Sequence, residues 1–280
     1  MPDSPFLSAA LALSAAACWG AGDFSGGLAA RRSDAFRAVL IPYTIGLVAM
    51  IILALTRGEP FTTPADVAWG ALAGLSGMIG LGFLFRGFTL GRMGIVAPIS
   101  AVLGTALPVI FEGLSRGLPQ PSQLAGFGIA LVGVVLLSRP EHLTGRPQGV
   151  GMAVLAGLGF GGFFLGLDQV SGEAVFWPLA AGRAAALLAM LAFALATRRK
   201  ISLRGSPLGL FALAGVLDVS GNLFFLLSIQ KGRLDVTAVL GSLYPAVTAL
   251  IAWVALQERL TRPQVMGVVA ALLAIALITT

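Results

Sequence analysis

The chain has 280 residues, of which 57% are hydrophobic and only 11% are charged, and its formal net charge is +6. A soluble domain carries about 25% charged residues, so this composition excludes an ordinary soluble enzyme, a coiled coil and a disordered chain. The cations stand in short clusters between apolar runs, which argues against a nucleic-acid-binding face. The mean hydropathy of +0.94 indicates a protein whose surface faces the hydrocarbon of a bilayer.

Ten apolar runs are separated by connectors rich in charged residues, proline or glycine, and each run has about the length of a membrane-spanning helix. The first run is predicted to be retained, because the positively charged start of a cleaved signal peptide does not precede it. The expected fold class is an all-α membrane protein with ten transmembrane helices. In chain order the predicted spans are 6–28, 38–56, 67–90, 94–115, 122–138, 149–171, 175–196, 207–230, 235–256 and 263–279.

Lysine and arginine are distributed unequally between the connectors. The odd-numbered connectors contain 12 of these residues and the even-numbered ones contain four, when Arg86 and Arg183 inside the spans are left out. Positively charged connectors tend to stay in the cytoplasm. The odd connectors are therefore predicted to be cytoplasmic and both termini periplasmic, in a bacterial inner membrane.

The second half of the sequence repeats the first. At an offset of 141 residues, the stretch 71–74 matches 212–215, and the same offset pairs Gly80 with Gly221. Further matches follow in the same order along both halves. A repeat of five spans begins on one side of the membrane and its copy begins on the other, so the two repeats have inverted topology. Inverted repeats are the structural basis of alternating access to a site near the midplane.

The repeat also sets the expected domain organisation. The predicted units are a first five-helix repeat at 1–139, a connector at 140–147 and a second five-helix repeat at 148–280. The two repeats are expected to enclose a central cavity, because transporters built from inverted repeats bind their cargo at the repeat interface.

Four features resemble a known transporter family. Pro108 and Pro245 stand in the middle of the fourth and ninth spans, the stretch 256–264 reads LQERLTRPQ, and Gly267 follows it. Together they are similar to the repeats of the EamA family of the drug/metabolite transporter superfamily, and the resemblance covers essentially the whole chain. It implies ten helices in two inverted halves, a central cavity and the export of small metabolites, often amino acids.

The most informative polar residues are predicted to meet deep in the membrane. Arg183 lies roughly 12 Å inside the seventh span, and Asn222 lies at the same depth in the eighth span, with Asp218 one turn deeper on the same face. An arginine matches a carboxylate and an aspartate suits an amine, so together they would bind a zwitterion. Two alternatives stay open: the pair only neutralises itself and joins two helices, or Asp218 carries a proton.

Other residues complete the predicted substrate site. Asp23 lies deep in the first span, one turn beyond Trp19, and Tyr244 stands beside Pro245. Trp19 and Tyr244 are predicted to line an aromatic cavity. Pro108 and Pro245 remove backbone hydrogen bonds inside their helices, and we expect them to act as hinge or gating positions.

Metal and cofactor sites are not expected. Cys18 is the single cysteine and His142 the single histidine, so the chain lacks the residues for a cysteine- or histidine-based metal site. The stretch 157–162 matches GxGxxG but lies in an apolar span without a preceding strand, so it predicts close helix packing. The same applies to Gly70 and Gly74, which have the GxxxG spacing.

The leading hypothesis is a secondary transporter, functional as a monomer, that exports amino acids or related zwitterions by alternating access. Its partners are the small-molecule cargo, the bilayer and, where transport is coupled, a proton, with no nucleic acid. One alternative is a flippase for a lipid-linked head group. A less favoured alternative is an intramembrane enzyme that uses Asp23, Asp168 or Asp218, because each of these acids lies on a separate span.

Overall fold

The computed structural model describes residues 5–90, 93–137, 149–199, 206–256 and 261–279. These residues form α-helices and connectors, with no strand among them, which confirms the all-α class. The helices are α1 (Pro5–Arg31), α2 (Ala35–Arg57), α3 (Pro64–Leu90), α4 (Met93–Ser115), α5 (Pro121–Leu137), α6 (Val150–Asp168), α7 (Phe176–Ala196), α8 (Leu208–Ile229), α9 (Leu234–Gly241), α10 (Tyr244–Leu256) and α11 (Arg262–Thr279).

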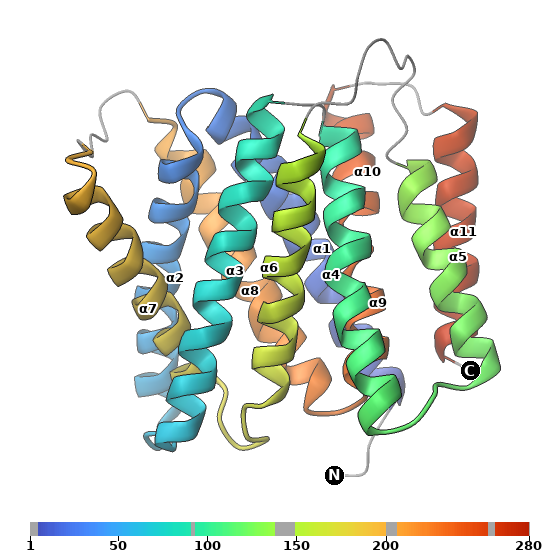
Figure 1. Ribbon diagram of the computed structural model, residues 1–280, viewed down its shortest axis with the longest axis horizontal. Coiled ribbons are helices and arrows are strands. Elements are labelled where there is room, and N and C mark those ends of the chain that lie inside the picture. Colours follow the sequence, from blue (N-terminus) through green and yellow to red (C-terminus); the bar gives the residue numbers. More distant parts are fainter. Residues whose placement is uncertain (1–4, 91–92, 138–148, 200–205, 257–260, 280) are drawn as a thin grey trace.

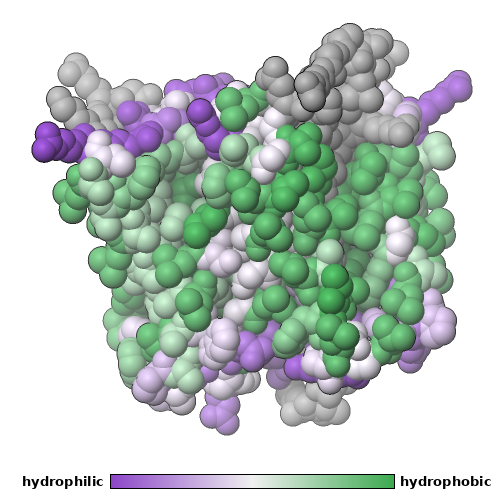
Figure 2. Space-filling model, in the orientation of Figure 1, coloured by the Kyte–Doolittle hydropathy of each residue, from purple (hydrophilic) through white to green (hydrophobic). Residues whose placement is uncertain are grey.

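The surface of the helical body is that of a membrane protein. Figure 2 shows a broad hydrophobic band around the middle, with hydrophilic residues gathered at both ends of the helices. Within the described residues, α1, α2, α3, α6, α7 and α8 are long and apolar enough to cross a bilayer. Both termini lie at the same end of the body, which we call the N-terminal face (Figure 1).

The ninth predicted span, 235–256, is divided into two helices. The chain leaves helical geometry at Ser242 and Leu243, between α9 and α10. Pro245, in the first turn of α10, explains the break, because proline has no N–H to donate to the carbonyl four residues earlier, that of Gly241. Its counterpart Pro108 lies inside α4, which stays a single helix.

The most extensive helix contacts join a helix of one sequence repeat to a helix of the other. Helix α1 packs against α8, and α3 packs correspondingly against α6; α2 contacts α8, and α7 contacts α3. The chain climbs from the N-terminal face in α1 and descends towards it in α6, so the two repeats run in opposite directions (Figure 1). The connector 140–147 lies outside the described residues.

This packing produces two bundles, and each contains helices from both repeats. We call α1, α2, α8, α9 and α10 the α1–α8 bundle, and α3, α4, α6 and α7 the α3–α6 bundle. The contact of α2 with α7 joins the bundles, and α5 pairs with α11 beside them (Figure 1). The compact units are therefore not the two halves of the sequence.

Small residues allow the helices of the α3–α6 bundle to approach closely. A side chain added at Gly74 would collide with the backbone of Gly182 on α7, and one added at Gly70 would collide with Pro178. In the GxGxxG stretch, Gly159 lies against the backbone of Gly80 on α3. These contacts confirm that both glycine patterns serve helix packing.

Candidate functional site

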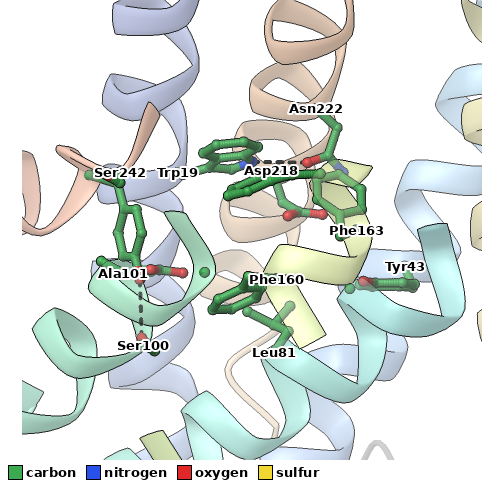
Figure 3. A pocket seen from close by; sticks show the side chains of 15 residues that line it. Trp19, Tyr43, Leu81, Ser100, Ala101, Phe160, Phe163, Asp218, Asn222 and Ser242 are labelled. Carbon is green, nitrogen blue, oxygen red and sulfur yellow. Dashed lines mark hydrogen bonds between the residues drawn. The ribbon is translucent and has the colours of Figure 1, made fainter. Parts of the chain in front are cut away.

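A central cavity lies between the two bundles. It measures about 60 Å³, which is room for about four water molecules. Asp218, one of its lining residues, is at the middle of α8, so the cavity lies near the middle of the hydrophobic band. Figure 3 shows how its side chains converge. The lining residues are Trp19, Asp23, Tyr43, Gly77, Leu81, Ser100, Ala101, Gly104, Phe160, Phe163, Phe164, Asp218, Asn222, Ser242 and Tyr244.

The two sides of this cavity differ in chemistry. The α1–α8 bundle supplies the acidic wall, which consists of Trp19, Asp23, Tyr43, Asp218, Asn222, Ser242 and Tyr244. The α3–α6 bundle supplies the aromatic wall, which consists of Gly77, Leu81, Ser100, Ala101, Gly104, Phe160, Phe163 and Phe164. Both carboxylates are therefore on one side, and three phenylalanine rings face them from the other.

Trp19 connects the two walls. Its indole Nε1–H donates a hydrogen bond of 2.9 Å to Oδ1 of Asn222 (Figure 3), which satisfies the polar atom of a largely apolar side chain. Its ring lies 5.9 Å from that of Phe164 and 5.3 Å from that of Phe225. Phe164 and Phe225 stack at 4.6 Å. This cluster fixes the orientation of both Trp19 and Asn222.

Arg183 and Asp218 meet, as their predicted depths indicated. Nη2 of Arg183 lies 2.5 Å from Oδ2 of Asp218, and the arginine side chain is only 4% exposed. The guanidinium carbon lies 4.1 Å from the centre of the Tyr43 ring, a cation–π contact. Gly46, one turn after Tyr43, leaves space for the Arg183 side chain. Because Arg183 belongs to α7 and Asp218 to α8, this ion pair joins the two bundles.

Arg183 does not line the central cavity; it borders a smaller cavity of about 10 Å³ beside it, together with Tyr43 and Asn222. Its Nη1 atom is buried without a hydrogen-bond partner among the described residues. In this conformation Arg183 therefore contacts two lining residues of the central cavity, Asp218 and Tyr43, without lining the cavity itself.

Asp23 differs from Asp218 in having no cation beside it. Its carboxylate lines the central cavity and a neighbouring one that Asp218 also borders. Asp23 makes no hydrogen bond or ion pair with any described residue, whereas Asp218 has Arg183. Among the described residues, no lysine or arginine lines the central cavity. The acidic wall therefore holds two carboxylates and, through the neighbouring Arg183, one guanidinium.

Tyr244 lies at the break between α9 and α10 and closes one end of the cavity. Its hydroxyl is 3.2 Å from Oγ of Ser100 on α4, with either atom able to donate. Thr248, one turn later, donates to the Gly20 carbonyl at 2.9 Å, which ties α10 to α1. Pro108 and Pro245 are buried but do not line the cavity, and their hinge role stays a prediction.

Five of the six predicted substrate-binding residues line the cavity, and the sixth, Arg183, stands behind it. Sequence reasoning did not identify Tyr43, Ser100 or Ser242. Tyr43 offered a usable signal, since it is one of two tyrosines in the chain and lies mid-span beside Pro42. In the described residues no group of three or more His, Cys, Asp or Glu side chains could hold a metal ion.

A second charged cluster lies at the N-terminal face. Nη1 of Arg116 lies 3.4 Å from Oε1 of Glu112, and Nη2 lies 3.8 Å from Oδ1 of Asp168. The same Glu112 oxygen accepts the backbone N–H of Leu234 at 3.0 Å, at the start of α9. Glu112 is fully buried, whereas the side chain of Arg116 is 52% exposed.

Arg233 extends this cluster. It pairs with the buried Asp235 at 2.9 Å and donates to the carbonyl of Gly117 at 3.2 Å. The hydrogen bonds to Asp235 raise the pKa of Arg233. Leu234 begins α9 and Arg233 precedes it, whereas Glu112 lies in the last turn of α4 and Gly117 follows that helix. These contacts therefore join the two bundles at the N-terminal face.

Comparisons with known proteins give a consistent result. The model of the EamA-like transporter family matches residues 6–139 and again residues 147–280, so it covers nearly the whole chain in two copies. One solved crystal structure matches with a TM-score of 0.76 at 18% identity, over 97% of this chain and 98% of its own, which shows a shared fold. No curated protein matches the sequence.

Proposed function

The chain belongs to the EamA-like transporter family of the drug/metabolite transporter superfamily, and from that premise we propose that it exports small metabolites, most of all amino acids or related zwitterions, by alternating access. As a member of this family it is a membrane transporter that handles small-molecule cargo. The cargo class, the direction of transport and its mechanism are the proposal. We further propose that it functions as a monomer.

The proposed topology has ten crossings, in which α9 and α10 together form one. The N-terminal face would be periplasmic in a bacterial inner membrane, because 12 of the 16 connector cations are on the odd connectors, at the opposite face. The repeats would divide at the connector 140–147.

The central cavity is the observation that supports transport most strongly. It lies at mid-membrane, holds ionisable residues that are costly in lipid, and has one wall from each bundle. A cavity of about 60 Å³ is too small for most amino acids, so this conformation is nearly closed. Loading a cargo requires the two walls to separate.

We propose that the two mixed bundles, and not the two sequence halves, are the bodies that rock. Opening towards the N-terminal face would break the hydrogen bond from Leu234 to Glu112 and the contact of Arg233 with Gly117. Opening towards the other face would break the ion pair of Arg199 with Asp34, which also joins the bundles. Pro108 and Pro245 are the proposed hinge positions. The driving force would be the cargo gradient or a coupled proton.

Reconstitution in liposomes tests this function. Purified protein should equilibrate at least some members of a panel of radiolabelled amino acids faster than protein-free liposomes do. Equal rates across the panel would contradict the amino-acid proposal. A parallel panel of other small metabolites would then measure whether the transporter prefers another cargo class.

A further inference from the structure

The charges around the central cavity do not cancel. Asp218 is matched by Arg183, whose guanidinium is held between that carboxylate and the Tyr43 ring. Asp23 has no such partner, and the described lining contains no other cation. An isolated carboxylate in a low-dielectric site is strongly stabilised by a positively charged ligand. The cavity is therefore one positive charge short when both acids are ionised.

Among the described residues, no lysine or arginine lines the cavity surface to pair with a carboxylate. Arg183 is the only guanidinium near the site in the described residues, and it stands behind Asp218 and outside the lining. Arg183 is paired with Asp218, so the charge that it carries is already matched. The acidic wall thus favours an ammonium group over a carboxylate.

The aromatic side chains suit the same ligand. Phe160, Phe163 and Phe164 face the acidic wall across the cavity, and Trp19 and Tyr244 flank Asp23 in the lining. The faces of aromatic rings attract cations by about 0.5 to 2 kcal/mol, and the rings also accept an apolar chain. Of the other polar groups of the lining, Oδ1 of Asn222 accepts from Trp19, and the hydroxyls of Ser100 and Tyr244 pair with each other.

We propose that the central cavity binds organic ammonium ions, with the cargo ammonium at Asp23 and its apolar body against the aromatic wall, and that Arg183 is a positioning residue that holds Asp218. The proposal rests on the proposed function, because it takes the central cavity to be the cargo site. Within the small metabolites of the proposed function, it favours an amine that lacks a free carboxylate over a zwitterion.

Three probes with similar apolar chains separate these possibilities. Isoamylamine carries the ammonium alone, isocaproate carries the carboxylate alone, and leucine carries both. Binding is measured by isothermal titration calorimetry on the full chain in detergent. We expect isoamylamine to bind about tenfold more tightly than leucine, and isocaproate to show no binding.

Variants locate the site. Asp23→Asn should lower isoamylamine affinity about tenfold, Asp23→Glu should retain most of it, and the exposed-acid control Glu173→Gln should leave it unchanged. Tighter binding of leucine than of isoamylamine would overturn the ammonium proposal and leave the transport proposal intact. An unchanged amine affinity in folded Asp23→Asn would also overturn it. Absence of binding by all three probes, together with no transport in liposomes, would overturn both.

Discussion

The two walls of the central cavity correspond to each other under the sequence repeat, yet they differ in chemistry. The two family matches start 141 residues apart, and this offset aligns cavity-lining residues of one wall with cavity-lining residues of the other. The aligned pairs are Trp19 with Phe160, Asp23 with Phe164, Asp218 with Gly77, and Asn222 with Leu81. In each of these four pairs the aromatic wall carries an apolar residue where the acidic wall carries a side chain that can form hydrogen bonds.

The repeat therefore fixes the backbone and the location of the cavity, and substitutions at a few positions place both carboxylates on one wall. A fully symmetric cavity would carry four carboxylates at these positions, and their mutual repulsion in a low dielectric would be severe. Concentrating both acids on one wall leaves the other free to supply aromatic surface. The following substitutions test that division of roles.

The largest effect is expected when the acidic wall loses the partner of Arg183. Asp218→Asn leaves a guanidinium that is 4% exposed without its counter-ion, which should cost about 3 kcal/mol of stability. The measurement is thermal unfolding in detergent. The double variant Arg183→Gln with Asp218→Asn removes both charges and should recover most of the loss. A single variant as stable as the wild type would show that the ion pair does not hold the bundles together.

A smaller effect is expected when the acidic wall is made to match its counterpart at Asn222. Asn222→Leu copies Leu81 and leaves the indole N–H of Trp19 without its acceptor, at a cost of about 1 to 2 kcal/mol. The same unfolding assay measures this cost, and the fluorescence emission of the protein should shift as Trp19 reorients. The reverse change, Leu81→Asn, is the matched control, and it should not alter the hydrogen bond of Trp19.

The contact of the Tyr43 ring with Arg183 should contribute less to stability than the ion pair of Asp218 or the hydrogen bond of Asn222. Tyr43→Leu removes the ring below the guanidinium, a loss of about 1 kcal/mol, whereas Tyr43→Phe keeps the ring and should retain the stability of the wild type. If both variants lose the same stability, the hydroxyl of Tyr43 and not its ring face supports Arg183. Calorimetric unfolding of the two purified variants distinguishes these outcomes.

The smallest effect is expected at the edge of the membrane. Arg199 and Asp34 also join the two bundles, but their side chains are 42% and 31% exposed. Water screens such a pair, so Asp34→Asn should change the free energy of unfolding by about 1 kcal/mol at most. The N-cap hydrogen bond that the Asp34 carboxylate accepts from the backbone N–H of Arg37 contributes to that figure. A loss as large as that of Asp218→Asn would remove the proposed contrast between buried and exposed charges.

Much of the fold was predictable from the sequence. Hydropathy located the helices to within a few residues, because each crossing needs a fixed length of apolar chain. Counting residues from the span ends also placed Arg183 and Asp218 at depths from which they could meet, and they do. The break before Pro245 was less predictable, since Pro108 takes the same place in an unbroken α4. Local packing decides between a kink and a break.

The arrangement of helices around the cavity was not predictable in the same way. The position of a residue along a span does not show which neighbouring helix its side chain contacts. For this reason Tyr43 and Ser100 were not identified as lining residues. The exchange of helices between the repeats is likewise a property of packing.

Access to the cavity from the two sides of the membrane tests the central claim most directly. Cys18 is the single cysteine, so Cys18→Ala provides a background in which Ser242→Cys places one thiol in the cavity lining. Membrane-impermeant thiol reagents are then applied to right-side-out and inside-out vesicles. The account predicts labelling from both sides, because the two bundles open the same cavity alternately. Labelling from one side only, in a variant that still transports, would contradict it.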